Sequence, residues 1–362
     1  MKVLHVLWSD YLSGAEKIVL KISRMMKSNF GVSIGVACFN GSNSAEHSLE
    51  KMFKEEGVEV FTSERKLLHF VKIIKKAIIT FRPDVVHSHD YRATLATILA
   101  RFLILKNRPI HIAHIHDAYP FMERINLKSL VGFFVLSLPS KILAVSDHIL
   151  NGMWFSKLIR NKTFVLLNPY LGKVTFISRK EAIRKKNVDL IFVGRLVPKK
   201  HPEIFCEVCK RLNVKGIIIG TGPLKDELKE RYRNSVEFLG YRKDAENWMM
   251  KSKFLFLPSE YEGFGLVIIE AIANYCIPIV TPWKGVTKII ECNKTGFIVP
   301  WDVNLASGRI KDLLVNYGEI FEEFYNTRLK TLGNFSLGDY VEKLKQIYEM
   351  LVCQKGGGDS CF

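Results

Sequence analysis

The sequence has little of what marks a metal-binding, disulfide-rich or redox-active protein. Its seven cysteines are scattered over 362 residues, and the CxxC pair Cys206 and Cys209 is followed by no second pair at metal-ligand spacing. The two cysteines lie beside Ile204, Phe205 and Val208 at helical spacing, so we expect both thiols in a core. Free thiols are typical of proteins in a reducing cytoplasm.

Long apolar segments are also scarce. After Lys2, only six mainly apolar residues precede Ser9, too few for the apolar region of a secretory signal peptide. The very apolar stretch at residues 130–138 is stopped by Pro139 and is too short to cross a bilayer. We therefore expect a cytoplasmic protein, with a peripheral position at the inner face of the cell membrane as an option.

The common nucleotide-binding fingerprints are missing. No GxGxxG follows the first predicted strand, and no Walker A sequence is present. The segment Gly220-Thr221-Gly222 follows a strand but lacks the third glycine of a dinucleotide fingerprint. Dehydrogenases and P-loop NTPases are therefore not favoured.

Acidic residues are outnumbered. The chain has 53 Lys and Arg against 36 Asp and Glu, a net charge of +17 that is spread over both halves. Such a surplus favours polyanionic partners, namely nucleic acid, anionic lipid or phosphorylated ligands. Residues 66–82 predict an amphipathic helix with a cationic face, formed by Lys66, Lys72, Lys75, Lys76 and Arg82. That face could rest on an anionic membrane at about 1 kcal/mol per charge, or it could simply be solvated.

Apolar strand patterns alternate with amphipathic helix patterns along the chain, which predicts an α/β fold with parallel sheets covered by helices on both faces. Strands are predicted at residues 2–8, 32–39, 58–61, 84–89, 109–116, 141–146, 189–195, 215–220, 236–240, 254–259 and 277–282. The alternation is interrupted near residue 171 by a polar, Lys-rich segment. We therefore expect two Rossmann-like domains with ligands at the carboxyl ends of the strands, in a cleft between them.

The domain boundaries follow from this interruption. Residues 1–171 form the expected N-terminal domain and residues 172–338 the C-terminal domain. Residues 339–352 predict a last helix, and residues 354–362 have no periodicity and predict a disordered tail.

Two carboxylates mark the most informative segment, SEYEGFGLVIIEA. Glu262 is expected in the loop that leaves a buried strand, and Glu270 two turns into a helix that begins near Leu266. Gly263 and Gly265 allow close backbone approach to a ligand, and the helix start offers N–H groups to a phosphate. Carboxylates on both sides of such a cradle can hold sugar hydroxyls. A solvated loop Glu and a helix-surface Glu are the plain alternative.

Other candidate residues follow predicted strands. Arg195 and Lys200 can neutralise a pyrophosphate, and Gly14 permits close backbone approach after the first strand. Five histidines lie along two neighbouring strands, His87 and His89 on one and His111, His114 and His116 on the other. His114 and His116 share a face, but no carboxylate cluster with ligand spacing surrounds them, so we expect no metal.

In chain order these segments resemble family 4 of the retaining nucleotide-sugar glycosyltransferases, also called glycosyl transferases group 1. The matching pieces are Gly14-Ala15-Glu16, DVVHSH, His116-Asp117, VGRLVPKKHPE, IIGTGPLKDEL, FLGY, the segment with two glutamates and KTGFIVP. The resemblance covers residues 1 to about 350.

The resemblance implies the GT-B architecture, with the donor held by the second domain and the acceptor by the first. It implies that the last helix crosses back onto the first domain, that His116 and Glu262 contact the transferred sugar, and that Glu270 binds the ribose. Backbone groups of Gly263, Phe264, Gly265 and Leu266 would meet the phosphates, and the base would lie near Tyr241. No metal and no other cofactor are expected. The implied partners are a nucleotide sugar and a saccharide or lipid-linked acceptor, as in bacterial surface polysaccharide synthesis, and no nucleic acid.

Besides Ser13 and His201, which stand where relatives usually have glycine, the chain departs from the family pattern in two segments. Tyr275 and Cys276 stand where relatives usually have glycine, and Trp283, Lys284 and Lys288 replace the usual residues of the next loop. These positions are expected near the donor sugar or the cleft wall.

Two alternatives remain open from the sequence. One is a GT-B-like nucleotide-sugar epimerase, which would act without an acceptor. The other is a basic protein without enzymatic activity that binds membrane or nucleic acid.

Overall fold

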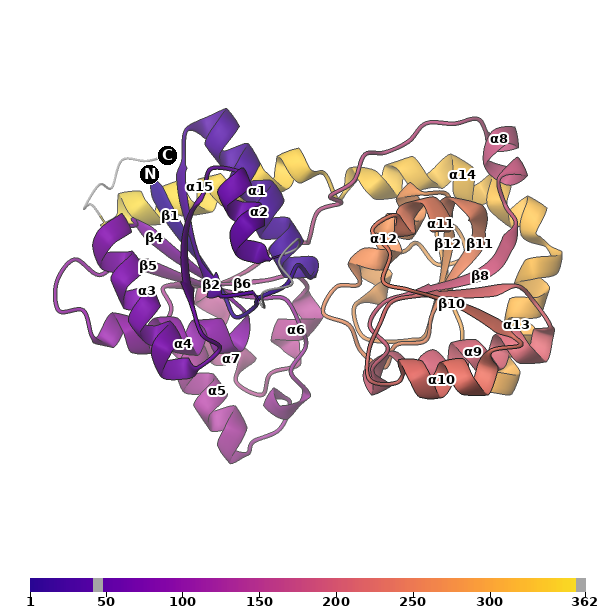
Figure 1. Ribbon diagram of the computed structural model, residues 1–362, viewed down its shortest axis with the longest axis horizontal. Helices are drawn as coiled ribbons and strands as arrows, with labels where there is room; N and C mark the ends of the chain where they lie inside the picture. Colours follow the sequence, from indigo (N-terminus) through magenta and orange to yellow (C-terminus); the bar gives the residue numbers. More distant parts are fainter. Residues whose placement is uncertain (42–47, 356–362) are drawn as a thin grey trace. The chain divides into compact units, whose positions relative to one another are not determined.

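A computed structural model describes residues 1–41 and 48–355, and the chain divides into two compact units. The first unit comprises Met1–Leu171 and the C-terminal segment that begins at Leu337, and the second comprises Gly172–Ser336 (Figure 1). Each unit is built around its own parallel sheet.

The sheet of the first unit has seven strands, and every neighbouring pair is parallel. From edge to edge the strands are β3 (Glu59–Ser63), β2 (Ser33–Phe39), β1 (Lys2–Leu7), β4 (Val85–His89), β5 (Ile110–Ile115), β6 (Lys141–Ala144) and β7 (Thr163–Val165). The order reverses between β1 and β4, which is the switch point where ligands bind in Rossmann-like sheets.

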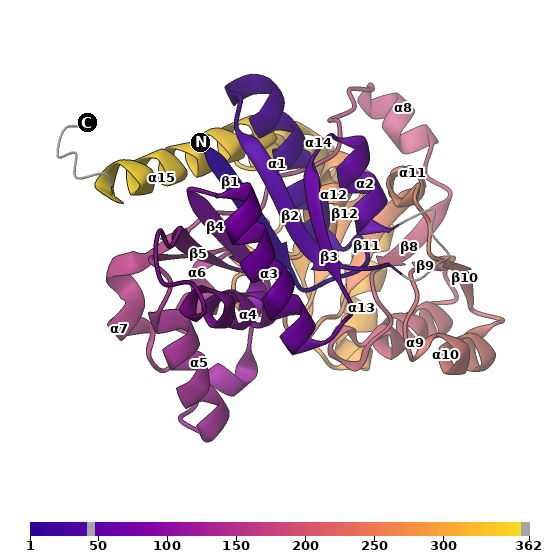
Figure 2. The same ribbon diagram turned by 60° about the vertical axis from the view of Figure 1, so that its left-hand side comes forward.

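Helices cover both faces of this sheet (Figures 1 and 2). They are α1 (Gly14–Phe30), α2 (Leu49–Glu55), α3 (Leu67–Phe81), α4 (Asp90–Phe102), α5 (Leu127–Ser137), α6 (Asp147–Asn151), α7 (Ser156–Ile159) and α15 (Leu337–Lys355), with 3₁₀ turns η1 (Pro120–Met122) and η2 (Arg160–Lys162). On one face, Leu4 and Val6 of β1 share a buried cluster with Phe70 and Ile74 of α3 and Ala96 of α4.

The opposite face of β1 and β4 is covered by α15. Tyr340, Leu344 and Tyr348 of this helix are buried, and the Tyr348 hydroxyl lies 2.5 Å from Nδ1 of His87 on β4. The helix continues to Lys355, two residues into the segment for which disorder was expected, and residues 356–362 of that segment lie outside the described residues.

The sheet of the second unit has six strands, again all parallel. Their order is β10 (Val236–Gly240), β9 (Gly216–Ile219), β8 (Val188–Val193), β11 (Ser252–Leu257), β12 (Ile277–Val280) and β13 (Phe297–Ile298). Here the order reverses between β8 and β11, so the carboxyl ends of these two strands form the second switch point.

The helices of the second unit are α8 (Arg179–Arg184), α9 (Pro202–Leu212), α10 (Lys225–Tyr232), α11 (Ala245–Lys251), α12 (Leu266–Ala273), α13 (Val303–Val315) and α14 (Tyr317–Gly333), with η3 (Pro198–Lys200) and η4 (Val286–Lys288). Cys206 and Cys209 are buried in α9, which confirms that they are core residues. Burial raises the pKa of the Cys206 thiol to about 12.

Gly220 and Gly222 are required for packing between two loops. A Cβ atom on Gly220 would lie 1.8 Å from the carbonyl oxygen of Gly194, and one on Gly222 would lie 2.3 Å from that of Leu196. The two glycines thus let the loop after β9 pass directly against the loop after β8.

Within the described residues no helix is both long enough and apolar enough to cross a membrane. The apolar stretch at residues 130–138 falls mostly in α5.

Candidate functional site

The loop after β11 places Glu262 in a buried ion pair at the switch point of the second unit. Its Oε1 accepts a hydrogen bond from Nζ of Lys200 and another from the hydroxyl of Ser259, both at 2.6 Å. Ser259 is itself fixed, because its carbonyl accepts a hydrogen bond from Thr281 at 2.6 Å. The fold therefore brings two of the site residues predicted from the sequence, Lys200 and Glu262, into direct contact.

Electrostatics keep Glu262 ionised. Burial alone would raise the pKa of this carboxyl, but the charge of Lys200 and hydrogen bonds from Lys200 and Ser259 lower the pKa below its ordinary value. An ionised carboxylate has only acceptor oxygens. Glu262 therefore suits a ligand that presents hydroxyl groups.

Arg195 lies in the same loop as Lys200 but in different surroundings. It is exposed, and within the described chain its side chain forms no hydrogen bond or ion pair. Lys200 folds back against Gly194, where an added Cβ would lie 3.3 Å from Cδ of the lysine. The loop thus offers one buried cation that is paired with a carboxylate and one exposed cation that is available to an anion.

The start of α12 lies next to this pair. Gly265 has φ of 80°, a left-handed conformation that favours glycine, and it directly precedes Leu266. The side chain of Phe264 packs edge-on against Phe335, so only its backbone can serve a ligand. Glu270 is half-buried in the second turn of α12, and Tyr241 is exposed after β10.

Of the positions that depart from the family pattern, Trp283 and Tyr275 differ in role. Trp283 lies near the start of α12, where its ring is 3.5 Å from the place of a Cβ on Gly265. Tyr275 is instead part of the core. Its hydroxyl donates to the carbonyl of Thr175 at 2.8 Å, and its ring lies 3.7 Å from the guanidinium of Arg328. Tyr275 has φ of 59°, so the backbone keeps the left-handed conformation that a glycine would favour.

In the first unit, Gly14 begins α1 directly after the capping residue Ser13. The backbone N–H of Ser13 donates to Oε2 of Glu16 at 3.1 Å, and the Ser13 hydroxyl also donates to that oxygen. This pairing fixes the start of α1 and holds Glu16 near the end of β1.

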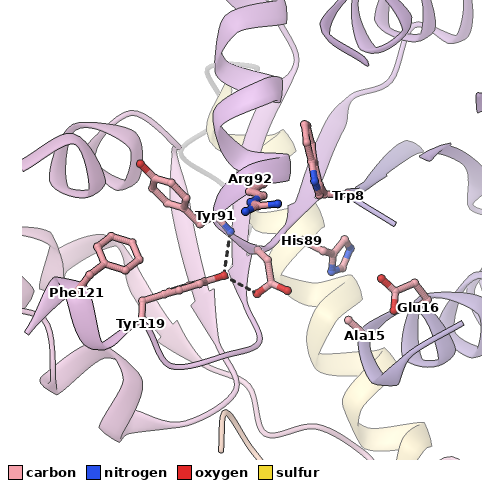
Figure 3. Close-up of a pocket in the computed structure, with 9 residues that line it drawn as sticks. Trp8, Ala15, Glu16, His89, Tyr91, Arg92, Tyr119 and Phe121 are labelled. Carbon is pink, nitrogen blue, oxygen red and sulfur yellow. Dashed lines mark hydrogen bonds between the residues drawn. The ribbon is translucent and has the colours of Figure 1, made fainter. Parts of the chain in front are cut away.

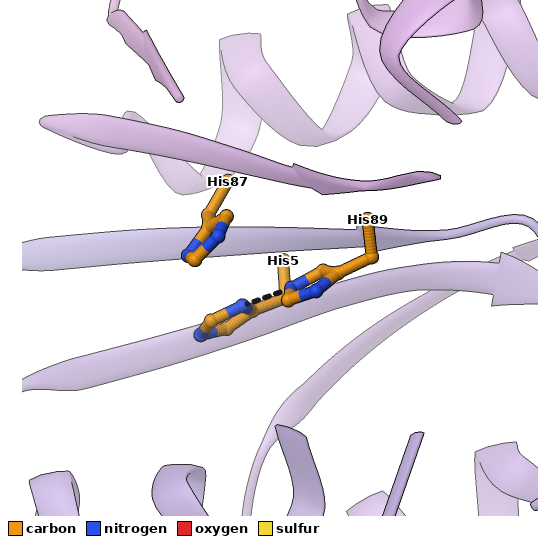
Figure 4. A group of neighbouring side chains, drawn as sticks. All are labelled: His5, His87 and His89. Atoms are coloured by element: carbon orange, nitrogen blue, oxygen red, sulfur yellow. Dashed lines mark hydrogen bonds between the residues drawn. The ribbon is translucent and has the colours of Figure 1, made fainter. Parts of the chain in front are cut away.

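Five histidines from β1, β4 and the end of β5 lie together on the face of the sheet that α15 covers. Nδ1 of His5 is 2.9 Å from Nε2 of His89 (Figure 4). Nδ1 of His89 is in turn 2.9 Å from Nε2 of His116. His87 and His114 stack beside this chain, with 5.3 Å between their ring centroids. His114 and His116 share a face as the alternation predicts, whereas His111 points to the other face and bonds Ser88.

Burial keeps these imidazoles neutral. It lowers the pKa of His5 to about 3. It also lowers the pKa of His116 to about 4, although the carboxylates of Glu16 and Asp117 oppose the shift. A neutral imidazole has one N–H and one acceptor nitrogen, so a chain of three rings can be bonded in one consistent direction.

Two sets of three histidines have nitrogens close enough to hold a metal ion, namely His5, His87 and His89, and His89, His114 and His116. In both sets His89 already bonds a neighbouring histidine, so a metal would replace these hydrogen bonds. Both nitrogens of His114 are buried without a partner in the described structure. Imidazole nitrogens suit zinc, copper or nickel.

A pocket of about 410 Å³ opens at the switch point of the first unit (Figure 3). Its lining residues are Trp8, Ala15, Glu16, His89, Asp90, Tyr91, Arg92, Tyr119 and Phe121. Tyr91, Tyr119 and Phe121 form one aromatic wall, with ring centroids 5.8 to 6.2 Å apart. Aromatic faces beside a carboxylate and an arginine suit a ligand with both apolar and hydroxyl-bearing surfaces, such as a sugar ring.

The sequence patterns assigned no role to Asp90, which is one of the lining residues. Its Oδ1 accepts hydrogen bonds from the backbone N–H of His116 at 2.9 Å and from the Tyr119 hydroxyl at 3.1 Å. Burial raises its pKa to about 6. Its φ of 68° is uncommon for a residue other than glycine, and such strain is concentrated at functional sites. Its place directly after β4, at the switch point, is the signal that could have identified it.

Two family descriptions match consecutive parts of the chain. Residues 12–169 match Glycosyltransferase Family 4, and residues 173–327 match Glycosyl transferases group 1. The chain therefore belongs to the glycosyltransferases that these two families describe. The recognition of this family from the sequence is confirmed.

Curated relatives align over nearly their whole length. The chain is 22% identical to the UDP-Gal:alpha-D-GlcNAc-diphosphoundecaprenol alpha-1,3-galactosyltransferase of Escherichia coli, with 98% of each chain covered. It is 25% identical to an N-acetyl-D-galactosaminyltransferase of Campylobacter jejuni whose named acceptor is a saccharide on diphosphoundecaprenol, with 97% of this chain and 99% of the relative covered.

Solved structures share the fold. HepE from Anabaena, crystallised in complex with UDP-glucose, has a TM-score of 0.78 and 18% identity, with 97% of this chain and 100% of that chain covered. The α/β fold with two Rossmann-like units, the fold of the GT-B glycosyltransferases, is thus confirmed.

Proposed function

We propose that this glycosyltransferase transfers a hexose-type sugar from a nucleotide-diphosphate donor to a saccharide or lipid-linked acceptor, with retention of the anomeric configuration. The observation that carries the proposal is the buried ion pair between Lys200 and Glu262 at a switch point, with Arg195 unpaired in the same loop. A cation and a carboxylate at this position match the diphosphate and the hydroxyls of one donor molecule.

The second unit supplies the donor contacts in this proposal. Arg195 and Lys200 bind the diphosphate, and their attraction grows as negative charge develops on the departing phosphate. Glu262 accepts hydrogen bonds from sugar hydroxyls, and Glu270 accepts them from the ribose. Backbone N–H groups of Gly263 to Leu266, at the start of α12, add further donors to the phosphates.

The first unit supplies the acceptor contacts and one donor contact. The pocket at the end of β4 takes the acceptor saccharide between its aromatic wall and Asp90. His116, held by His89, contacts the transferred sugar. Gly14 at the start of α1 lets the backbone approach the donor phosphates.

The reaction breaks the bond between the anomeric carbon and the diphosphate oxygen, and the electrons of that bond stay on the diphosphate. The acceptor hydroxyl attacks the same face of the anomeric carbon, and its proton goes to the departing phosphate. Arg195 and Lys200 neutralise the leaving group, so this route requires no metal ion and no other cofactor. Exclusion of water protects the donor from hydrolysis.

Two observations support a lipid-linked saccharide as the acceptor. The named relatives act on saccharides linked to diphosphoundecaprenol, and this chain carries a net charge of +17, which favours an anionic membrane. We therefore place the protein at the cytoplasmic face of a bacterial membrane, in surface polysaccharide synthesis. Nucleic acid has no part in this proposal. Membership of a glycosyltransferase family favours neither the epimerase nor the binding-protein alternative.

A thermal-shift panel with UDP-, GDP-, ADP- and CMP-linked sugars, with and without EDTA, tests the proposal. One donor class should raise the melting temperature of the protein, and EDTA should leave the rise unchanged. The same donor and a soluble saccharide acceptor should then give an α-linked product from an α-linked donor, as read by NMR. Inversion at the anomeric carbon, loss of turnover with EDTA, or epimerised donor in the absence of acceptor would each contradict it.

A further inference from the structure

The outer side of the first unit carries an unusual number of exposed apolar side chains. Leu105 after α4 and Leu127 at the start of α5 are 90% and 80% exposed. Four more large apolar side chains each expose more than half of their surface, namely Phe102 at the end of α4, Ile125 before α5, Phe134 in α5 and Leu158 in α7. We call these six residues the tip surface.

The three segments that carry the tip surface pack on one another. Helix α4 packs directly against α5. Helix α5 also contacts the segment before α7. Phe133 packs edge-on against Phe155, with 5.4 Å between the ring centroids, and Ser129 accepts a hydrogen bond from the Trp154 indole at 3.0 Å. Figures 1 and 2 both show α5 at the outer end of the first unit. The inner face of α5 is therefore occupied, and its outer apolar residues have no cover within the unit.

Positive charge dominates around the tip surface. Residues 99–108, 124–141 and 153–165 together contain nine Lys and Arg and no Asp or Glu, and one exposed acidic residue, Glu123, directly precedes the second range. Lys106, Arg124, Lys128, Lys157 and Arg160 are exposed and form no ion pair within the described chain. Apolar side chains ringed by unpaired cations are the combination that binds the interface of an anionic bilayer.

Helix α3, the basic helix that the sequence suggested for this role, is less suited to it. Its apolar stripe, with Phe70 and Ile74, is buried against the sheet. One of its cations, Lys66, is already paired with Glu64 at 2.9 Å. Its outer face carries two large apolar side chains that are more than half exposed, Leu68 and Ile79, against six on the tip surface.

We propose that the tip surface docks the first unit onto an anionic lipid bilayer, with Leu105, Leu127 and Phe134 inserted among the headgroups. This inference rests on the proposed function in one respect, since the lipid-linked acceptor would be presented by the same bilayer. A bilayer fits better than a second copy of the chain, because the segments that carry the apolar residues hold nine cations and no acidic residue, so two copies of this surface would bring like charges together.

Vesicle co-sedimentation tests the surface directly. Wild-type protein should bind vesicles that contain phosphatidylglycerol and bind pure phosphatidylcholine vesicles much more weakly. The double substitution Leu127→Ser with Phe134→Ser and the double reversal Arg124→Glu with Lys128→Glu should each weaken binding by about ten-fold or more. Matched controls are Leu305→Ser with Val315→Ser, two exposed apolar residues of α13, and Lys72→Glu with Lys76→Glu on α3. The controls should bind like the wild type.

Two further measurements separate this inference from the proposed function. All variants should keep the wild-type thermal shift with nucleotide sugar and the wild-type turnover of a soluble acceptor, while the tip variants lose turnover of a lipid-linked acceptor in vesicles. Absence of any donor effect in the wild type would overturn the proposed function and leave the vesicle result intact. Unchanged vesicle binding by both tip variants, loss of binding in the α3 control, or concentration-dependent dimers that the tip variants abolish would overturn the docking proposal.

Discussion

Arg195 and Lys200 carry the same charge in opposite surroundings. Arg195 is exposed and its side chain has no partner in the described chain, so Arg195→Ala removes no hydrogen bond or ion pair from the folded protein. We expect its melting temperature to stay at the wild-type value while kcat/KM falls about 100-fold, since charge stabilisation of a leaving group is typically of this size. Steady-state kinetics and a melting curve on the same preparation check both halves of the prediction.

Lys200→Ala is the contrasting variant. It leaves the buried Glu262 carboxylate without its cation, so both stability and turnover should fall. Lys199→Ala, one residue earlier, serves as the control and should keep most of the activity. Equal kinetics for Arg195→Ala and wild type would remove the exposed arginine from the mechanism.

Asp90 predicts a pH dependence. Burial raises the pKa of Asp90 to about 6, so the carboxyl is protonated below that pH. One of its two oxygens then carries a proton and can no longer accept a hydrogen bond from a hydroxyl of the acceptor saccharide. We expect kcat/KM for the acceptor to fall as pH drops below about 6, and the Asp90→Asn variant to lose this inflection. Asparagine retains the Oδ1 acceptor and tolerates the left-handed backbone.

The stability contribution of Asp90 has the opposite sign. A carboxyl whose folded pKa lies above its unfolded pKa contributes stability that is full below the unfolded pKa, about 3.9, and lost as pH rises through about 6. At low pH the activity should thus fall, while the protonated form of Asp90 stabilises the folded state. An acid limb that survives unchanged in Asp90→Asn would show that another group controls the profile.

At the scale of elements, Gly220→Ala tests the packing between two loops. The new Cβ would meet the carbonyl oxygen of Gly194, which belongs to backbone that cannot move aside freely. We expect a loss of about 3 kcal/mol in the free energy of unfolding, measured by urea denaturation. Gly308→Ala in α13 is the matched control, because nothing lies within 4 Å of its Cβ position, and it should stabilise the protein by up to about 1 kcal/mol.

Most strands were predictable because their apolar runs are long and bounded by polar residues. The two that were missed are short edge strands. β7 has three residues, two of them exposed, and β13 has two residues. Helix α8 was not predicted, because it lies in the polar segment after residue 171. Its start does carry the S-x-x-E pattern of a helix N-terminus, in which Ser178 accepts a hydrogen bond from the N–H of Glu181.

Within the site, sequence order could identify Glu262 and Lys200, because each follows an apolar strand. It could not show that the two side chains meet, since 62 positions separate them and only the pairing of β8 with β11 brings their loops together. The three-residue histidine chain was hidden for the same reason, because His5, His89 and His116 come from three strands. Asp90 could be noticed from its place directly after a predicted strand, but no local pattern encodes its backbone conformation and its burial.

At the scale of the whole molecule, the buried histidines predict acid sensitivity. The pKa of His5 is lowered to about 3 by burial, so the unfolded chain takes up a proton near pH 6.5 that the folded chain refuses. Stability should therefore fall as the pH drops, and His5 alone accounts for about 2 kcal/mol between pH 6.5 and about pH 4.5. Denaturant melts at several pH values give the slope.

The variant His5→Gln should flatten this slope, whatever its stability at neutral pH. His69→Gln is the control, because His69 is an exposed side chain beside Glu64 and its replacement should leave the slope nearly unchanged. A slope in His5→Gln equal to that of the wild type would mean that the buried imidazole is protonated in the folded state.

The left-handed backbone at Tyr275 makes its replacement a sum of opposed effects. Glycine would relieve roughly 1 kcal/mol of conformational strain, yet it would also sever the hydroxyl link to Thr175 and the stack on Arg328. A modest net change in unfolding free energy would thus conceal two larger ones that nearly cancel. A double-mutant cycle with Arg328 would separate the two effects. The contribution of the Tyr275 side chain through Arg328 would be measured as the coupling energy of the cycle and not as the loss in the single mutant.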